Sequence, residues 1–163
     1  MLRMAHVFVL ANLPGRRDDA FKLATEMAIE AKMSGRSATM SNTAVALLNA
    51  AERADPKARD KRLIDLAVPL LRDPLPEDLR SKPERDLQEH LIGAARLVGY
   101  AYHLRGDPTR AAAAIRDAME MVGKLKPPEG TSADQFAENT KQRLKDLEAI
   151  LKEYSGDKPA PSP

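Results

Sequence analysis

The sequence predicts an all-α protein in which antiparallel helix hairpins stack as a short α-solenoid with a C-terminal capping helix. Apolar residues recur at three- and four-residue spacing along most of the 163 residues, and no segment alternates as a strand would. Alanine is abundant, aromatic residues make up only 4% and tryptophan is absent, which favours close helix–helix packing over a sheet. Gly and Pro turn signals divide these segments into pairs. A compact bundle of non-repeating helices is the alternative fold.

The first hairpin is expected at about 2–34. Its first helix covers 2–12 and is stopped by Leu13-Pro14-Gly15, and its second begins near Arg17. The apolar N-terminal stretch is interrupted by His6 and Asn12 and lacks a clean cleavage site of small residues. It therefore predicts a short helix rather than a signal peptide.

The second hairpin is expected at about 37–72. Its first helix starts at Ser37 or Ser41 and continues to about Arg53. Asp55-Pro56 has the composition of a helix start, with the aspartate as cap and the proline as the first helical residue. Pro69 lies inside the apolar pattern that follows, so we expect it to kink that helix or end it early.

The third hairpin, at about 83–125, has the clearest turn. Gly106 can end its first helix in a left-handed conformation, Asp107 can cap the second helix and Pro108 suits the first helical position. Two helices approach closely only where side chains are small, so Gly99 is expected to face Ala111 and Ala114. Tyr102 and Ile115 would fill the remaining space.

This third hairpin resembles a tetratricopeptide repeat. Val98-Gly99 followed by Tyr102 is similar to the L-G-x-x-Y core of that repeat, and small and bulky residues follow at its expected offsets. The residues that carry the resemblance and would pack the repeat are Val98, Gly99, Tyr102, Gly106, Ala111, Ile115 and Ala118. The match covers about one repeat and departs from the pattern at Ala95, usually a bulky aromatic residue, and at Gly123, often a proline. The resemblance implies a protein that binds other proteins rather than one that catalyses a reaction.

A final helix is expected over 132–154, with Ser132 as its cap. Its apolar stripe has regular three–four spacing and its other faces are polar, as in a helix that closes the exposed end of a solenoid. The stripe consists of Phe136, Thr140, Leu144, Leu147, Leu151 and Tyr154. Residues 1–154 are expected to form a single helical-repeat domain, and 155–163 a flexible, Pro-rich tail.

A partner-binding groove follows from the resemblance, because the first helix of each tetratricopeptide repeat lines the concave face. Here that face would carry Gly93, Arg96, Tyr100 and His103, which share three–four spacing and lie outside the packed stripe. Arg96 can pair with a carboxylate, Tyr100 offers an aromatic wall and His103 a hydrogen bond. The carboxylate-clamp pattern of the family is not seen, so recognition of a C-terminal carboxylate is not implied. Helix phase extends the groove to Asn139, Gln142 and Arg143, and on its other side to Asn42 and Asn49.

An equally simple interpretation is that these groove residues are just exposed.

The sequence offers little evidence for other classes of function. It contains no Walker loop, dinucleotide fingerprint or Gly-x-Ser-x-Gly motif, and its three histidines lack metal-ligand spacing. We therefore expect no enzyme, cofactor or metal site.

Charge and composition predict the kinds of partner and the cellular location expected for this protein. A formal charge of +2 with both signs mixed argues against a nucleic-acid surface, and no apolar run is long enough to cross a membrane. A cytoplasmic location is expected, with a periplasmic or exported one left open, and the use of Ala, Arg, Asp and Pro suggests a GC-rich bacterial genome.

Two roles remain from these arguments. The first is a non-catalytic interaction module that binds a peptide or helix of another protein in the groove. The second is a structural, self-associating accessory domain of a longer protein. The run of Val7, Phe8, Val9 and Leu10 motivates the second role, because such residues must be covered by their own chain, by a second copy or by further residues.

Overall fold

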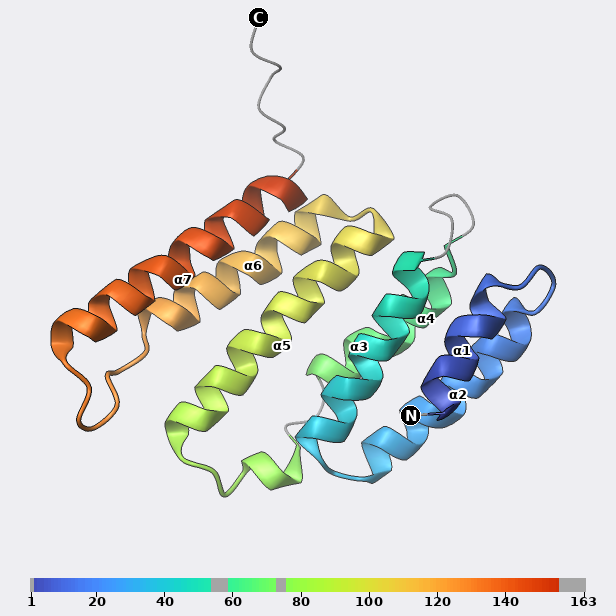
Figure 1. Cartoon of the computed structure of the whole chain (residues 1–163), viewed down its shortest axis with the longest axis horizontal. Helices are drawn as coiled ribbons and strands as arrows, with labels where there is room; N and C mark the ends of the chain where they lie inside the picture. Colours follow the sequence, from blue (N-terminus) through green and yellow to red (C-terminus); the bar gives the residue numbers. More distant parts are fainter. Residues whose placement is uncertain (1, 54–58, 73–75, 156–163) are drawn as a thin grey trace, which may run out of the picture. The chain divides into compact units, whose positions relative to one another are not determined.

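The protein is all-helical. The computed structural model describes residues 2–53, 59–72 and 76–155, and no strand occurs within these ranges. The elements, in chain order, are α1 (Leu2–Asn12), α2 (Arg17–Met33), α3 (Ser37–Arg53), α4 (Lys61–Arg72), the 3-10 helix η1 (Glu77–Leu79), α5 (Glu84–Arg105), α6 (Pro108–Gly123) and α7 (Ala133–Tyr154) (Figure 1). Backbone contacts divide the chain into two compact units, Met1–Lys82 and Pro83–Pro163. The expected tail falls on residues outside the described ranges from position 156 onward.

The first unit contains two helix hairpins, α1–α2 and α3–α4. Helix α1 contacts α3, and α2 contacts both α3 and α4, so equivalent helices of the two hairpins are neighbours. The interior of this unit is aliphatic: α3 packs on α4, and Leu47 and Leu48 of α3 and Leu63 and Ile64 of α4 are all at most 1% exposed. Burying a side chain of this size contributes roughly 1.5–3 kcal/mol.

The apolar N-terminal helix is covered by its own chain on one face only. Val7 and Leu10 of α1 are buried, whereas Leu2 is 90% exposed and Val9 50% exposed. The α1–α2 turn forms at the predicted stop, where Gly15 adopts a φ of 75°, a conformation that side chains with a Cβ rarely take.

Helix α4 ends at Arg72, where the second hairpin was predicted to end. It begins at Lys61, because Asp60 precedes it and its carboxylate accepts a hydrogen bond of 3.0 Å from the backbone nitrogen of Arg62. The predicted start at Asp55-Pro56 falls outside the described residues. Of the two effects expected of Pro69, the early end does not occur, since α4 continues to Arg72, and the kink stays a prediction. Burial of the helix's apolar face offsets the backbone hydrogen bond that proline removes.

The N-terminus of α3 is held by a residue far along the chain. Asp78 of η1 accepts a hydrogen bond of 2.9 Å from the backbone nitrogen of Ser37 and one of 2.8 Å from its hydroxyl, across a separation of 41 residues. A carboxylate at this position satisfies an unpaired N–H group and interacts favourably with the helix dipole.

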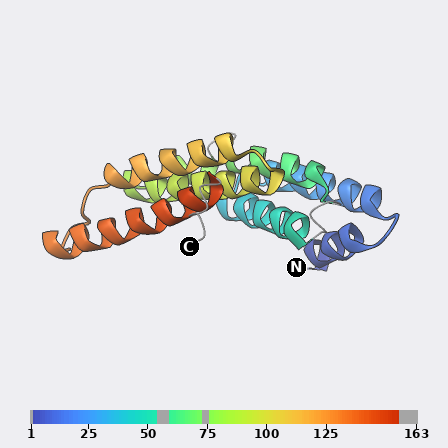
Figure 2. The ribbon, with the colours of Figure 1, turned by 90° about the horizontal axis from the view of Figure 1, so that it is seen from above.

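In the second unit, α5 and α6 form the hairpin that the sequence predicts. Gly106 has a φ of 80°, and the side chain of Asp107 accepts a hydrogen bond of 3.0 Å from the backbone nitrogen of Arg110. A Cβ atom added at Gly99 would lie 2.7 Å from Cδ1 of Ile115 and 3.3 Å from the carbonyl oxygen of Ala111. The two helices run side by side (Figure 2), and a larger residue at position 99 would require Ile115 or the helix backbones to shift.

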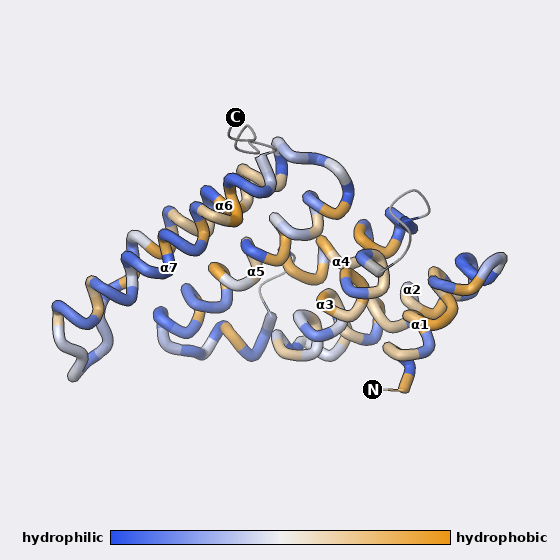
Figure 3. The backbone as a smooth tube through the Cα atoms, turned by 45° about the horizontal axis from the view of Figure 1, so that its top comes forward, coloured by the Kyte–Doolittle hydropathy of each residue, from blue (hydrophilic) through white to orange (hydrophobic). Residues whose placement is uncertain are grey.

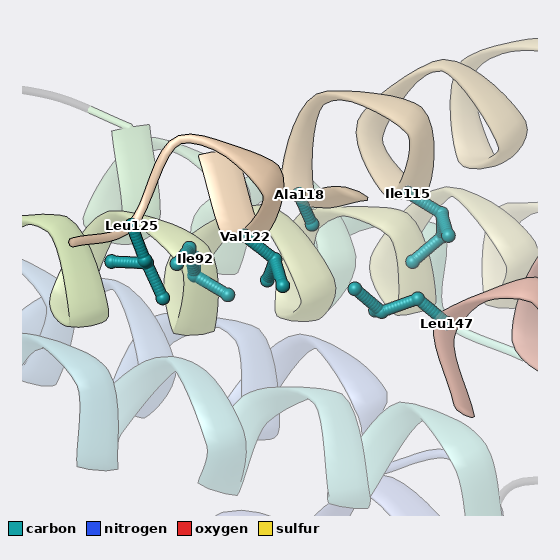
Figure 4. Close-up of a cluster of buried hydrophobic side chains, with 6 residues drawn as sticks. All are labelled: Ile92, Ile115, Ala118, Val122, Leu125 and Leu147. Carbon is teal, nitrogen blue, oxygen red and sulfur yellow. The ribbon is translucent and has the colours of Figure 1, made fainter. Parts of the chain in front are cut away.

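The hydrophobic core of this unit is centred on α6. Ile115, Ala118 and Val122 of α6 gather with Ile92 of α5, Leu125 of the α6–α7 loop and Leu147 of α7 (Figure 4). Leu147 is the one residue of α7 that is buried, and the rest of the predicted apolar stripe is half-buried. Most of α7 is hydrophilic along its length (Figure 3). Ser132 occupies the N-cap position of α7, as predicted, but its side chain makes no capping hydrogen bond.

Candidate functional site

A bidentate ion pair joins α5 to α7. The two guanidinium NH groups of Arg143 donate to the carboxylate of Glu89 at 2.9 and 2.7 Å. Both side chains are a little over one-third exposed, so solvent weakens the attraction. The planar fork of arginine nevertheless fixes the orientation of the two groups, because both oxygens are engaged at once.

An aromatic pair joins the same two helices further along. The rings of His103 and Tyr154 are stacked with centroids 4.3 Å apart and an angle of 18° between their planes. Glu89 and His103 are separated by roughly 20 Å along α5. Since the partners Arg143 and Tyr154 follow in the same order, α5 and α7 run parallel (Figure 1).

The predicted groove residues of α5 lie between these two pairs. Gly93, Arg96 and Tyr100 continue the three–four spacing from Glu89 to His103 and therefore share one face of the helix. Gly93 and Arg96 are exposed, and Tyr100 is half-buried. Arg96 makes no ion pair or hydrogen bond with any other residue that the structure describes.

A cleft of about 590 Å³, lined by both polar and apolar groups, opens at the start of this face. Asn139, Gln142 and Arg143 of α7 line it together with Arg85 of α5 and Thr131 of the α6–α7 loop. Arg85 donates a hydrogen bond of 2.8 Å to the backbone oxygen of Lys126 and thus holds the loop against α5. The side chain of Asn139 has no hydrogen-bond partner among the described residues, so its donor and acceptor can meet a ligand.

The structure thus brings Asn139 and Arg143 together in one cleft and places Arg96 and Tyr100 further along α5. His103 and Arg143 already have partners within the chain, which the helix phase did not indicate. Asn42 and Asn49 are exposed on α3 in the first unit. Glu89 was not identified as a site residue, because its partner is 54 positions away and no local pattern marks the pair.

The residues that carry the repeat resemblance form the α5–α6 contact. Ala111, Ile115 and Ala118 are 0% exposed, and Val98 is 4% exposed. Tyr102 is half-buried, and the guanidinium carbon of Arg110 lies 5.6 Å from the centre of its ring.

Acid is expected to weaken the second unit through Glu89. The hydrogen bonds from Arg143 lower the pKa of Glu89 below its ordinary value, even though burial acts in the opposite direction. A carboxylate with a lowered folded-state pKa stabilises the fold above its unfolded pKa of about 4.3, and this contribution is lost as the pH falls through the folded pKa. Urea unfolding of the wild type and of Glu89→Gln at pH 6 and pH 3 measures it.

We expect the wild type to lose more stability than Glu89→Gln over this interval, by less than about 1 kcal/mol because the pair is partly exposed. Equal losses in the two proteins would contradict a stabilising ion pair.

Comparison of the chain with protein-family models, curated proteins and solved structures gives no match. Within the described ranges, no cluster of three or more His, Cys, Asp or Glu side chains could hold a metal ion. Among the helices that the structure describes, none has the length and apolar character needed to cross a membrane.

Proposed function

We propose that this protein is a non-catalytic interaction module that holds a helix or peptide of another protein against the α5–α7 face. In this proposal α5 and α6 act as a tetratricopeptide-like hairpin, and α7 stands in the place of the first helix of a following repeat. The close approach at Gly99 and the parallel course of α5 and α7 support that assignment.

The observation that carries the proposal is the exposed Arg96, which has no ionic partner among the described residues. The half-buried Tyr100 follows Arg96 on the same face of α5. In the other direction, past the Glu89–Arg143 ion pair, lies the cleft that Asn139 lines. These groups can hold a peptide through an ion pair to Arg96, apolar contact with Tyr100 and hydrogen bonds to the amide of Asn139. The preferred ligand is therefore a peptide with an acidic residue next to an apolar one.

The test is a crosslinked pull-down from the native host with wild-type protein and with the double variant Arg96→Glu/Tyr100→Ala. We expect a partner to be captured by the wild type and lost with the double variant. The melting temperature should stay within a few degrees of the wild-type value, and the helix content should not change. Arg116→Glu, an exposed arginine of α6, is the charge-matched control and should retain the partner.

Two results would contradict the groove. An unchanged set of partners would move the contact elsewhere, and a large loss of stability would show that the two residues are structural. Recovery of only the protein itself would favour the second candidate function, self-association through α1, which the exposure of Leu2 and Val9 supports.

A further inference from the structure

A second groove runs along the flank of α7 that faces away from Asn139 and Arg143. It measures about 760 Å³ and lies between the end of α6 and α7. Its apolar lining includes Leu125, Phe136, Ala137 and Leu144. A helix that closed the end of a solenoid would present a polar surface here, so the groove departs from that expectation.

The groove exists because α7 is covered on one flank only. Leu147 points into the core around α6, as Figure 4 shows, whereas Ala137 is exposed and Leu144 is half-buried. Ala137, Lys141, Leu144 and Glu148 recur at three–four spacing and therefore form one continuous strip of the helix surface. This strip extends over three turns, roughly 16 Å, which is the length of a short helix laid alongside.

The rim of the groove is basic. Lys141 and Lys145 of α7 are one turn apart, and Glu148 is the one carboxylate among the groove's lining residues. Lys145 makes no ion pair with any residue in the described part of the chain, and Lys141 meets Glu138 only at 3.8 Å. Because few carboxylates of the protein neutralise these two ammonium groups, they favour a ligand that carries acidic groups at matching positions.

We propose that this groove binds an amphipathic helix of a partner protein. The apolar side of that helix packs on Phe136, Ala137 and Leu144, and its carboxylates pair with Lys141 and Lys145. An apolar floor with a charged rim is the surface that takes up a helix through residues at three–four spacing. Phe136 and Thr140 border both hollows, but Ala137, Lys141 and Lys145 lie on the other flank of α7 from Arg143, so this proposal does not depend on the function proposed for the α5–α7 face.

The experiment uses the full chain and two synthetic helical peptides of fourteen residues as probes, with binding measured by fluorescence anisotropy. Both peptides carry leucines at three–four spacing; one has glutamates beside them and the other has lysines. We expect the glutamate peptide to bind about tenfold more tightly, and Lys141→Glu/Lys145→Glu to reverse this preference. Raising the salt to 0.5 M should reduce the difference, because the rim is exposed.

Matched variants locate the binding. Ala137→Gln fills the groove without adding a charge and should weaken binding of the glutamate peptide about tenfold. Ala149→Gln, at another exposed position of α7, should leave that binding unchanged. Arg96→Glu should leave this binding unchanged, which separates the result from the test of the α5–α7 face. Failure of the glutamate peptide to bind, equal binding of both peptides, or no effect of Ala137→Gln would overturn the proposal. So would a dimer of the protein itself that Ala137→Gln abolishes, because a second copy would then occupy the groove.

Discussion

Replacing Gly99 by valine is expected to lower the free energy of unfolding by roughly 1–3 kcal/mol, the range for overpacking a well-filled interior. The new Cβ would lie 2.7 Å from Cδ1 of Ile115, which is 0% exposed and cannot move aside without displacing the core. It would also lie 3.3 Å from the backbone oxygen of Ala111, so α5 and α6 must separate. Urea unfolding followed by circular dichroism measures the change.

Gly93→Ala is the control, on the same helix. No atom lies within 4 Å of a Cβ added at Gly93, so alanine should stabilise α5 by roughly 0.5–1 kcal/mol through helix propensity. Ile115→Val removes the Cδ1 atom nearest to Gly99, and the combination Gly99→Ala/Ile115→Val should therefore be less damaging than the sum of its single changes. Equal effects at positions 93 and 99 would show that the helices do not meet at Gly99.

Leu147→Asp is expected to release α7 from the core. Leu147 is 3% exposed and belongs to the cluster around Ile115 and Val122, so the variant loses the apolar contact and places a carboxylate among apolar side chains. We expect a loss of about 3 kcal/mol or more from burial alone, since Leu→Ala at such sites costs roughly 2–5 kcal/mol. Amide hydrogen exchange resolved along 133–154 measures the release.

The cleft at Asn139 and the groove at Ala137 are both built on α7, so Leu147→Asp should remove both binding surfaces at once. Ala149→Asp places the same charge on an exposed position of the helix and should change stability by no more than about 0.5 kcal/mol. Protection of 133–154 that remained at the wild-type level in Leu147→Asp would mean that other contacts hold α7.

The relative size of these effects shows what holds α7 in place. Burial of Leu147 contributes roughly 2 kcal/mol, whereas a partly exposed ion pair such as Glu89–Arg143 contributes less than about 1 kcal/mol. The core therefore supplies the attachment. The ion pair and the His103–Tyr154 stack select the register of α7 along α5, because each requires particular groups to be opposite one another.

Local chemistry was sufficient to predict much of this molecule from its sequence. The bounds of α1, α2, α3, α5, α6 and α7 agree with the prediction to within about two residues, since Gly, Pro and Asp act on their immediate neighbours. The Gly106–Asp107 turn formed as expected for the same reason. Helical periodicity also placed Gly93, Arg96 and Tyr100 on one face, because phase is a property of the helix alone.

Tertiary structure decided the features that join distant residues. Asp78 reaches the start of α3 across 41 residues, and Arg143 reaches Glu89 across 54, which no spacing rule describes. The continuation of α4 through Pro69 depended on the apolar contacts of that helix, which outweigh a local penalty. The groove beside α7 also belongs here, because the sequence marks which residues are apolar but only packing determines which of them remain uncovered. Backbone preferences act over a few residues, whereas burial and ion pairing depend on distances in space.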